Sequence, residues 1–280
     1  MLLEIRHEIN YTYDRPVQLD VHTFRLRPQS NFRQNVRGFN ININPRPWGF
    51  YVVDELDGNS CVRATFDQET SYLFIGVNHL VETLCRNPFN FLLEPWAVYL
   101  PIDYPRSYLT KLEPYLRGGT GVVQEIAAEV SASVDGNVVQ FVTRLNQLIY
   151  DTCEHELRPT GNPYPPELTW KYKKGACRDV AVLFMECCRA VNLPARFVSG
   201  YIVGDLSTLD RERHLHAWAE VYLPGAGWVG FDPSQGLAVA DGHVALYASA
   251  DPLHTTPVSG KLRASGVSSQ MTYRILLKKS

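Results

Sequence analysis

The chain has 280 residues, enough to bury a substantial core and, judged by length, to form about two domains. Its composition is 45% hydrophobic and 20% charged, with a formal net charge of −2. This balance gives no reason to expect a nucleic acid or an anionic membrane as partner, because proteins that bind either carry a clear basic excess.

The sequence predicts a cytoplasmic protein with reduced thiols. No stretch approaches the roughly 18 uninterrupted apolar residues of a membrane helix, and charge appears at Glu4 and Arg6, too early for a signal peptide. A chain of this length needs no disulfides. None of the cysteines forms a CxxC pair of the kind that binds zinc. The six are Cys61, Cys85, Cys153, Cys177, Cys187 and Cys188.

Residues 1–84 are predicted to form an all-β domain. Apolar and polar residues alternate from Glu4 to Tyr13 and from Phe39 to Asn44. An Asp-Gly-Asn turn at residues 57–59 separates two further apolar runs, as in a hairpin. Several short strands at close intervals favour a β-sandwich. No catalytic pattern occurs in this region.

The rest of the chain is predicted to be an ordered connector followed by an α+β domain. Residues 85–105 contain four prolines among bulky aromatic residues, which indicates a connector without flexibility. Over 106–280 the patterns are helical first and strand-like later, which defines the α+β class. Helices are expected at 108–116, 122–134, 138–153 and 180–193, and strands at 195–203, 217–223, 227–232, 244–248 and 271–277.

Cys177 is a candidate nucleophile. It lies in a Gly-Ala-Cys-Arg-Asp segment directly before the apolar run from Val180 to Leu193. A thiol with a pKa near 8.5 is a poor nucleophile until it loses its proton, and the positive end of a helix favours the thiolate. The same helix start points N–H groups at an incoming carbonyl oxygen. Taken alone, the residue is equally compatible with a buried small side chain, the interpretation preferred for Cys187 and Cys188.

His216 and Asp232 are candidates for the base and for the group that orients it. His216 opens one predicted strand and Asp232 ends the next, with a Pro-Gly-Ala-Gly turn between them. In an antiparallel hairpin the start of one strand lies beside the end of the other. His214 is the alternative base. A metal site built on His214 and His216 is also conceivable, but no further ligand lies at a supporting spacing, so no metal or cofactor is expected.

These segments together resemble the bacterial transglutaminase-like proteins, which are related to papain-fold cysteine proteases. The matching motifs lie at 175–181, 188–201, 216–222 and 227–233, and the strands before residue 84 resemble the β-domain that precedes the core in this bacterial subfamily. The resemblance implies a papain-like, transglutaminase-like core with a Cys-His-Asp triad at Cys177, His216 and Asp232. It also implies Trp170 as a candidate for the oxyanion hole. The family often has Gln after the cysteine, where this chain has Arg178.

The resemblance implies a thiol enzyme that forms an acyl-enzyme from a protein or peptide substrate. Water as acceptor makes it a protease or amidase, which is favoured here, and an amine makes it a transglutaminase; a deamidase and a non-catalytic binding or scaffold module are further alternatives. Substrate choice is expected to depend on loops, among them 204–213 and 251–260. The sequence predicts neither the substrate-binding residues nor the oligomeric state.

Overall fold

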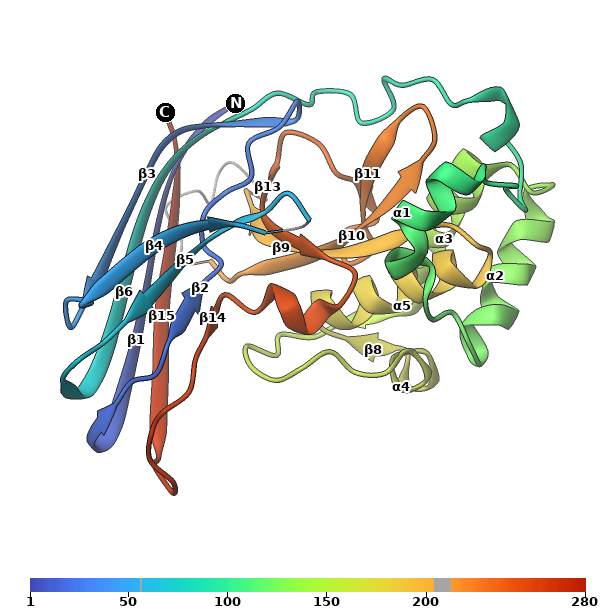
Figure 1. The fold of residues 1–280 in the computed structure, drawn as a ribbon. Coiled ribbons are helices and arrows are strands. Elements are labelled where there is room, and N and C mark those ends of the chain that lie inside the picture. Colours follow the sequence, from blue (N-terminus) through green and yellow to red (C-terminus); the bar gives the residue numbers. More distant parts are fainter. Residues whose placement is uncertain (56, 204–212) are drawn as a thin grey trace.

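The computed structural model describes residues 1–55, 57–203 and 213–280. One part of the molecule consists of two stacked antiparallel sheets (Figure 1). The first sheet has the order β15 (Ser269–Lys279), β1 (Leu2–Gln18), β6 (Glu69–Thr83), β3 (Gln34–Asn44). The second has the order β14 (Val258–Ser259), β2 (His22–Phe24), β5 (Ser60–Thr65), β4 (Gly49–Asp54). The predicted β-sandwich at the N-terminus is therefore confirmed.

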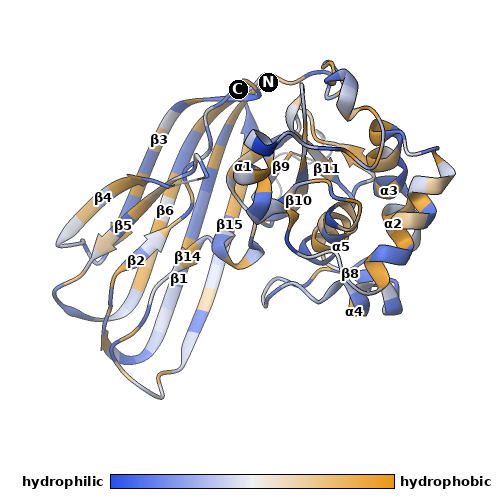
Figure 2. Ribbon diagram, turned by 45° about the vertical axis from the view of Figure 1, so that its right-hand side comes forward, coloured by the Kyte–Doolittle hydropathy of each residue, from blue (hydrophilic) through white to orange (hydrophobic). Residues whose placement is uncertain are grey.

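The alternating pattern of β1 explains how this sandwich is built. Leu3, Ile5 and Ile9 are buried, whereas Glu4 and Arg6 between them are exposed. Successive side chains of a strand point to opposite faces, so one face of the sheet packs inside while the other meets water. Figure 2 shows the same alternation of apolar and polar residues along the long strands.

The predicted boundary of the second domain, 106–280, is wrong at its C-terminal end. β15 pairs with β1 over eleven residues, from Leu3 opposite Lys279 to Tyr13 opposite Ser269, and β14 pairs with β2. Both segments therefore belong to the sandwich. The periodicity at 271–277 correctly indicates a strand, but pairing between strands some 260 residues apart is a property of the folded chain and has no local signal.

The core consists of helices packed on a five-stranded antiparallel sheet (Figure 1). The connector forms a short 3-10 turn, η1 (Pro95–Ala97). The helices are α1 (Arg106–Leu116), α2 (Val122–Ser133), α3 (Val138–Thr152), α4 (Pro166–Tyr172) and α5 (Cys177–Ala190). The sheet has the order β12 (Leu237–Ala238), β11 (Gly227–Asp232), β10 (His216–Leu223), β9 (Ala195–Ile202), β13 (His243–Ser249). Two short strands, β7 (Glu154–His155) and β8 (Lys174–Gly175), pair in parallel, and η3 (Pro252–Thr255) follows β13.

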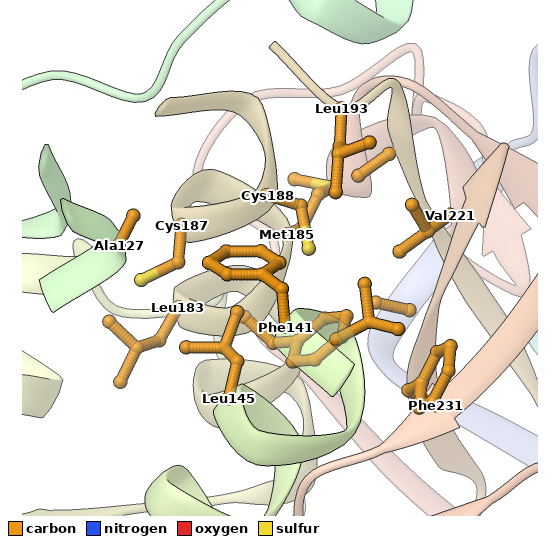
Figure 3. Packing of buried hydrophobic residues seen from close by; sticks show 14 of the residues in the cluster. Ala127, Phe141, Leu145, Leu183, Met185, Cys187, Cys188, Leu193, Val221 and Phe231 are labelled. Atoms are coloured by element: carbon orange, nitrogen blue, oxygen red, sulfur yellow. The ribbon is translucent and has the colours of Figure 1, made fainter. Parts of the chain in front are cut away.

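Helix α5 lies at the centre of the core and is buried on nearly all sides. Leu183 and Cys187 pack toward α3, where Phe141 and Leu145 meet them, while the sheet contributes Val221 (Figure 3). All five side chains are fully buried. A helix surrounded in this way has little freedom to move, because protein interiors are close-packed. This packing fixes the position of its first residue, Cys177.

The sandwich and the core are joined by hydrogen bonds from buried amide side chains. Gln34 accepts from the backbone N–H of Ala245 and donates to the carbonyl of the same residue, both at 2.8 Å. Asn59 bonds the N–H and carbonyl of Ala248 in the same way, at 2.9 and 2.7 Å. The edge of β13 is thus satisfied by side chains in place of another strand. Among the described residues, no helix has both the length and the apolar character needed to cross a membrane.

Candidate active site

The start of α5, where Cys177 lies, is held by the buried carboxylate of Asp179. One of its oxygens accepts the backbone N–H of Ala176 at 2.8 Å. The other accepts the N–H of Tyr164 at 2.8 Å and the guanidinium of Arg158 at 2.5 Å. A carboxylate in the first turn satisfies free N–H groups and suits the positive end of the helix. These hydrogen bonds hold the backbone of the Gly-Ala-Cys-Arg-Asp segment in place.

His216 and Asp232 lie side by side at one end of the hairpin formed by β10 and β11. The strands pair from Leu223 opposite Gly227 to Ala219 opposite Phe231, which brings the start of one beside the end of the other. His216 Nε2 lies 2.6 Å from Asp232 Oδ2. This bond leaves the Nδ1 side of the ring for another partner. The predicted neighbourhood of the two residues is thus present in the structure.

Asp232 is fully buried and accepts four hydrogen bonds. Oδ2 also lies 3.1 Å from His243 Nε2, while Oδ1 accepts from the hydroxyl of Ser234 at 2.7 Å and from its backbone N–H at 3.1 Å. Burial by itself raises the pKa of this carboxyl, but the charge and hydrogen bond of His216 and the hydrogen bond of His243 hold it well below its usual range. Asp232 is therefore a fixed negative charge behind the imidazole of His216.

The thiol and the imidazole shift each other's ionisation. Burial raises the pKa of the Cys177 thiol, but hydrogen bonds with His155 and His216 and the charge of His216 outweigh it, and the pKa falls to about 6. Burial lowers the pKa of His216, but Asp232 and the Cys177 hydrogen bond raise it to about 10. Between these values the favoured state is a thiolate beside an imidazolium, which is the reactive form of a nucleophilic cysteine.

His155 is a partner of Cys177 that the sequence analysis missed. It ends β7, whose pairing with β8 sets His155 opposite Gly175, two residues before the cysteine. Its pKa is raised, first by the hydrogen bond with Cys177. The thiol therefore has an imidazole from β7 in addition to the one from β10. His155 ends a two-residue strand that leaves no periodic signal. His243 was missed as well: the strand that it begins was predicted from residue 244, but no local pattern places it beside Asp232.

A cavity of about 570 Å³ opens over Cys177. Its walls come from several parts of the fold: the 155–163 segment after β7, the start of α5, strand β1, strand β15 and the segment 252–258. Of the two loops expected to affect substrate choice, 251–260 contributes directly to the wall. In the other, residues 204–212 lie outside the described residues, while Arg213 lines the cavity.

The remaining predicted residues do not contact the thiol in the predicted roles, although His214 also lines the cavity. Trp170, the oxyanion-hole candidate, packs against the helical core with Lys173 over its ring and is not among the residues that line the cavity, so its role stays a prediction without geometric support. His214, the alternative base, bonds Tyr273 through Nδ1 at 2.6 Å. Cys187 and Cys188 are fully buried, as expected.

Within the described part of the chain, one group of side chains has the spacing of metal ligands: His216, Asp232 and His243, with ligand atoms within 4.8 Å of one another. His214, the other half of the metal site considered from the sequence, is not in this group. The same three residues already bond one another through Oδ2 of Asp232. A metal ion there would replace the bond that orients His216, so the arrangement fits hydrogen bonding better.

Comparison with known proteins gives two family matches. Residues 124–233 match the family described as the transglutaminase-like superfamily, and residues 3–82 match the bacterial transglutaminase-like N-terminal region. An uncharacterized protein of Mycobacterium tuberculosis is 24% identical over 271 residues, covering 91% of this chain and 86% of its own. A protein-glutamine gamma-glutamyltransferase of Pseudomonas aeruginosa is 29% identical over 101 residues, covering 34% of this chain and 15% of its own.

A solved structure from Cytophaga hutchinsonii, described provisionally as a cysteine protease, has the same fold. It superposes with a TM-score of 0.73 at 19% identity, covering 100% of this chain and 91% of its own. The two family matches, which lie in the same order as the two parts of the fold, make the assignment, and the solved structure shares the fold. The chain belongs to the transglutaminase-like superfamily and carries the bacterial transglutaminase-like N-terminal region in front of its core.

Proposed function

We propose that the protein is a cysteine-nucleophile acyl-transfer enzyme that acts on peptide or carboxamide bonds as a protease or amidase. The observation that carries the proposal is geometric: Cys177 begins α5 in the wall of the cavity, His216 lines the same cavity, and His216 bonds Asp232 at 2.6 Å. In these surroundings the pKa of the Cys177 thiol is lowered to about 6 and that of His216 is raised to about 10. A purely structural thiol gains nothing from such a shift. Cys187, buried in the same helix, shows the ordinary behaviour, since burial raises its pKa.

The proposed reaction has two acyl-transfer steps. The Cys177 thiolate attacks the amide carbonyl carbon, the C–N bond breaks, and the leaving amine takes a proton from His216; a thioester remains on the sulfur. His216 then takes a proton from water, the hydroxide attacks the thioester, and the acid leaves as the thiolate is regenerated. Asp232, fixed by Ser234 and His243, holds the ring in one orientation through both steps.

Transglutamination is the second candidate function. The partial similarity to a protein named protein-glutamine gamma-glutamyltransferase, 29% identical over 101 residues, favours it. The chemistry of the first step is the same. The two outcomes differ only in whether water or an amine attacks the thioester, and the same cavity over Cys177 would have to admit the amine.

The test first measures the reactivity of Cys177 and then identifies the product of the reaction. Cys177 labelling by iodoacetamide is followed against pH by peptide mass spectrometry, with Cys177→Ala and His216→Ala as comparison. We expect a reactive thiol with an inflection near pH 6 that loses its low-pH reactivity in His216→Ala. Dimethylated casein with a fluorescent primary amine then distinguishes new peptide ends from amine incorporation. If Cys177 is labelled only above pH 8, and no faster than the other five cysteines, the proposal is contradicted and the non-catalytic binding role is favoured.

A further inference from the structure

The cavity over the candidate nucleophile has an uneven distribution of charge. Among the residues that the structure describes, three arginines line it, Arg158, Arg178 and Arg213, and one carboxylate, that of Glu156; Arg213 is engaged in a contact of its own. The carboxylate of Glu156 lies 3.5 Å from the ammonium of Lys174, which balances its charge. The wall near the thiol therefore presents positive charge to a molecule that enters.

Arg158 is already used by the protein itself. Its Nη2 donates to Asp179 at 2.5 Å, its Nη1 donates to the carbonyl of Asn162 at 3.0 Å, and the guanidinium stacks 3.9 Å from the centre of the Tyr164 ring. These contacts hold the loop that covers the start of α5. A ligand would have to compete with a buried carboxylate for this side chain.

Arg178, the residue directly after Cys177, is in a different state. In the described part of the chain it has no carboxylate partner, and its one hydrogen bond runs from Nη2 to the carbonyl of Thr160 at 2.5 Å. Its Nε is out of contact with water and has no partner. Burial, and then the positive charge of Arg158, lower its pKa. A partly desolvated cation beside another cation gains more from an anion than a solvated one does.

The opposite wall offers a second donor near the same place. Tyr273 lies on β15, and its hydroxyl is 2.6 Å from His214 Nδ1. Burial raises the pKa of Tyr273, and the positive charge of Arg178 lowers it. Apolar side chains such as Ile9 and Leu253 complete the wall. This combination suits a ligand with an aliphatic stem and a terminal carboxylate.

We propose that Arg178 binds a carboxylate of the acyl substrate, so that the enzyme prefers acidic peptides, or carboxamides with a carboxylate close to the scissile carbonyl. The inference rests on the proposed function, because it names the substrate class of the same site. Arg178 acts by binding: its planar guanidinium can hold a carboxylate through two parallel hydrogen bonds while the neighbouring thiolate meets the carbonyl carbon.

The test uses two alkylating reagents of nearly equal size, anionic iodoacetate and neutral iodoacetamide. In both reactions the thiolate of Cys177 attacks the methylene carbon, a thioether forms and iodide leaves. The quantity measured is the ratio of the two rate constants at Cys177, divided by the same ratio for N-acetylcysteine. Because both reagents need the same thiolate, a change in the pKa of Cys177 cancels in this ratio. The variants are Arg178→Gln, Arg178→Lys and, as a control of equal charge change, Arg144→Gln on the exposed face of α3.

We expect the normalised ratio to favour iodoacetate in the wild type and to fall about tenfold in Arg178→Gln, the effect of one charge about 6 Å away at an effective dielectric near 40. Arg178→Lys should retain most of the preference, and Arg144→Gln should equal the wild type. If Cys177 reacts fast with both reagents but Arg178→Gln leaves the ratio unchanged, the carboxylate site is refuted while the nucleophile stands. If Cys177 reacts with neither reagent faster than the other thiols, both the proposed function and this inference fall.

Discussion

The contact between His155 and Cys177 gives a quantitative prediction about the thiol. His155→Leu removes a hydrogen-bond donor from the thiolate, and a hydrogen bond to a charged group contributes about 1.5–3 kcal/mol. His155 is exposed on one side, so the lower end applies, which is about one pKa unit. The pKa of Cys177 should rise from about 6 to about 7. At pH 6 the thiolate fraction then falls from about one half to about one tenth, and the rate of alkylation falls about fivefold.

The assay is iodoacetamide labelling of the Cys177 peptide between pH 4.5 and 9.5, with unfolding checked by circular dichroism. At pH 9 the two proteins should react at nearly the same rate, because both thiols are then ionised. His214→Leu is the matched control: it removes an imidazole from the same cavity, but one that bonds Tyr273. An inflection that stays within about 0.3 units of the wild type in His155→Leu would refute the inferred hydrogen bond.

Three further predictions concern the base, the core and the response to acid. Asp232→Asn should cut the alkylation rate of Cys177 at pH 6 by about tenfold or more, since the imidazolium loses its counter-charge; an unchanged rate would show that Asp232 does not support His216. Arg189→Met should lower the free energy of unfolding, measured in urea, by about 3–5 kcal/mol, because Arg189 pairs with Glu186 and bonds three backbone carbonyls. A loss below about 1 kcal/mol would contradict a stabilising role for this hydrogen-bond network. Burial lowers the pKa values of His7 and His79 to about 3, so the unfolded chain binds more protons than the folded chain between pH 6.5 and 3. The free energy of unfolding therefore falls as the pH falls through this window, by up to about 1.4 kcal/mol per pH unit for each histidine. His7→Gln should reduce that slope, as measured by urea unfolding at several pH values, and an identical slope would contradict the assignment.

The parts of the site that the sequence could predict are those with a local cause. Cys177 precedes a long apolar run, and that run is a buried helix in the structure. His216 and Asp232 flank a short turn, so hairpin geometry alone brings them together at 2.6 Å. The nearly continuous apolar character of α5 likewise follows from its position at the centre of the core. In each case a pattern of fewer than about twenty residues determines the contact.

Contacts between distant segments have no such cause. His155 reaches Cys177 because a two-residue parallel bridge places β7 beside β8, and such a bridge carries no periodic pattern. His243 bonds Asp232 although β10 and β9 separate β13 from β11 in the sheet, and nothing in the order of the strands along the chain indicates this contact. Trp170 was selected by resemblance alone, and its ring packs into the helical core beside Lys173. Sequence order therefore predicts local neighbours but not these tertiary ones.

The N-terminal sandwich takes part in forming the site. Strand β1 contributes Ile9 and Tyr11 to the cavity wall, and β15, paired with β1 along eleven residues, contributes Met271 and Tyr273. The two strands are the central and edge strands of one sheet, and the sheet is joined to the core through buried side chains such as Gln34. Removing the sandwich from the protein would therefore also remove one wall of the cavity over Cys177. Because β1 and β15 lie far apart in the sequence, this wall of the cavity forms only where the two strands pair.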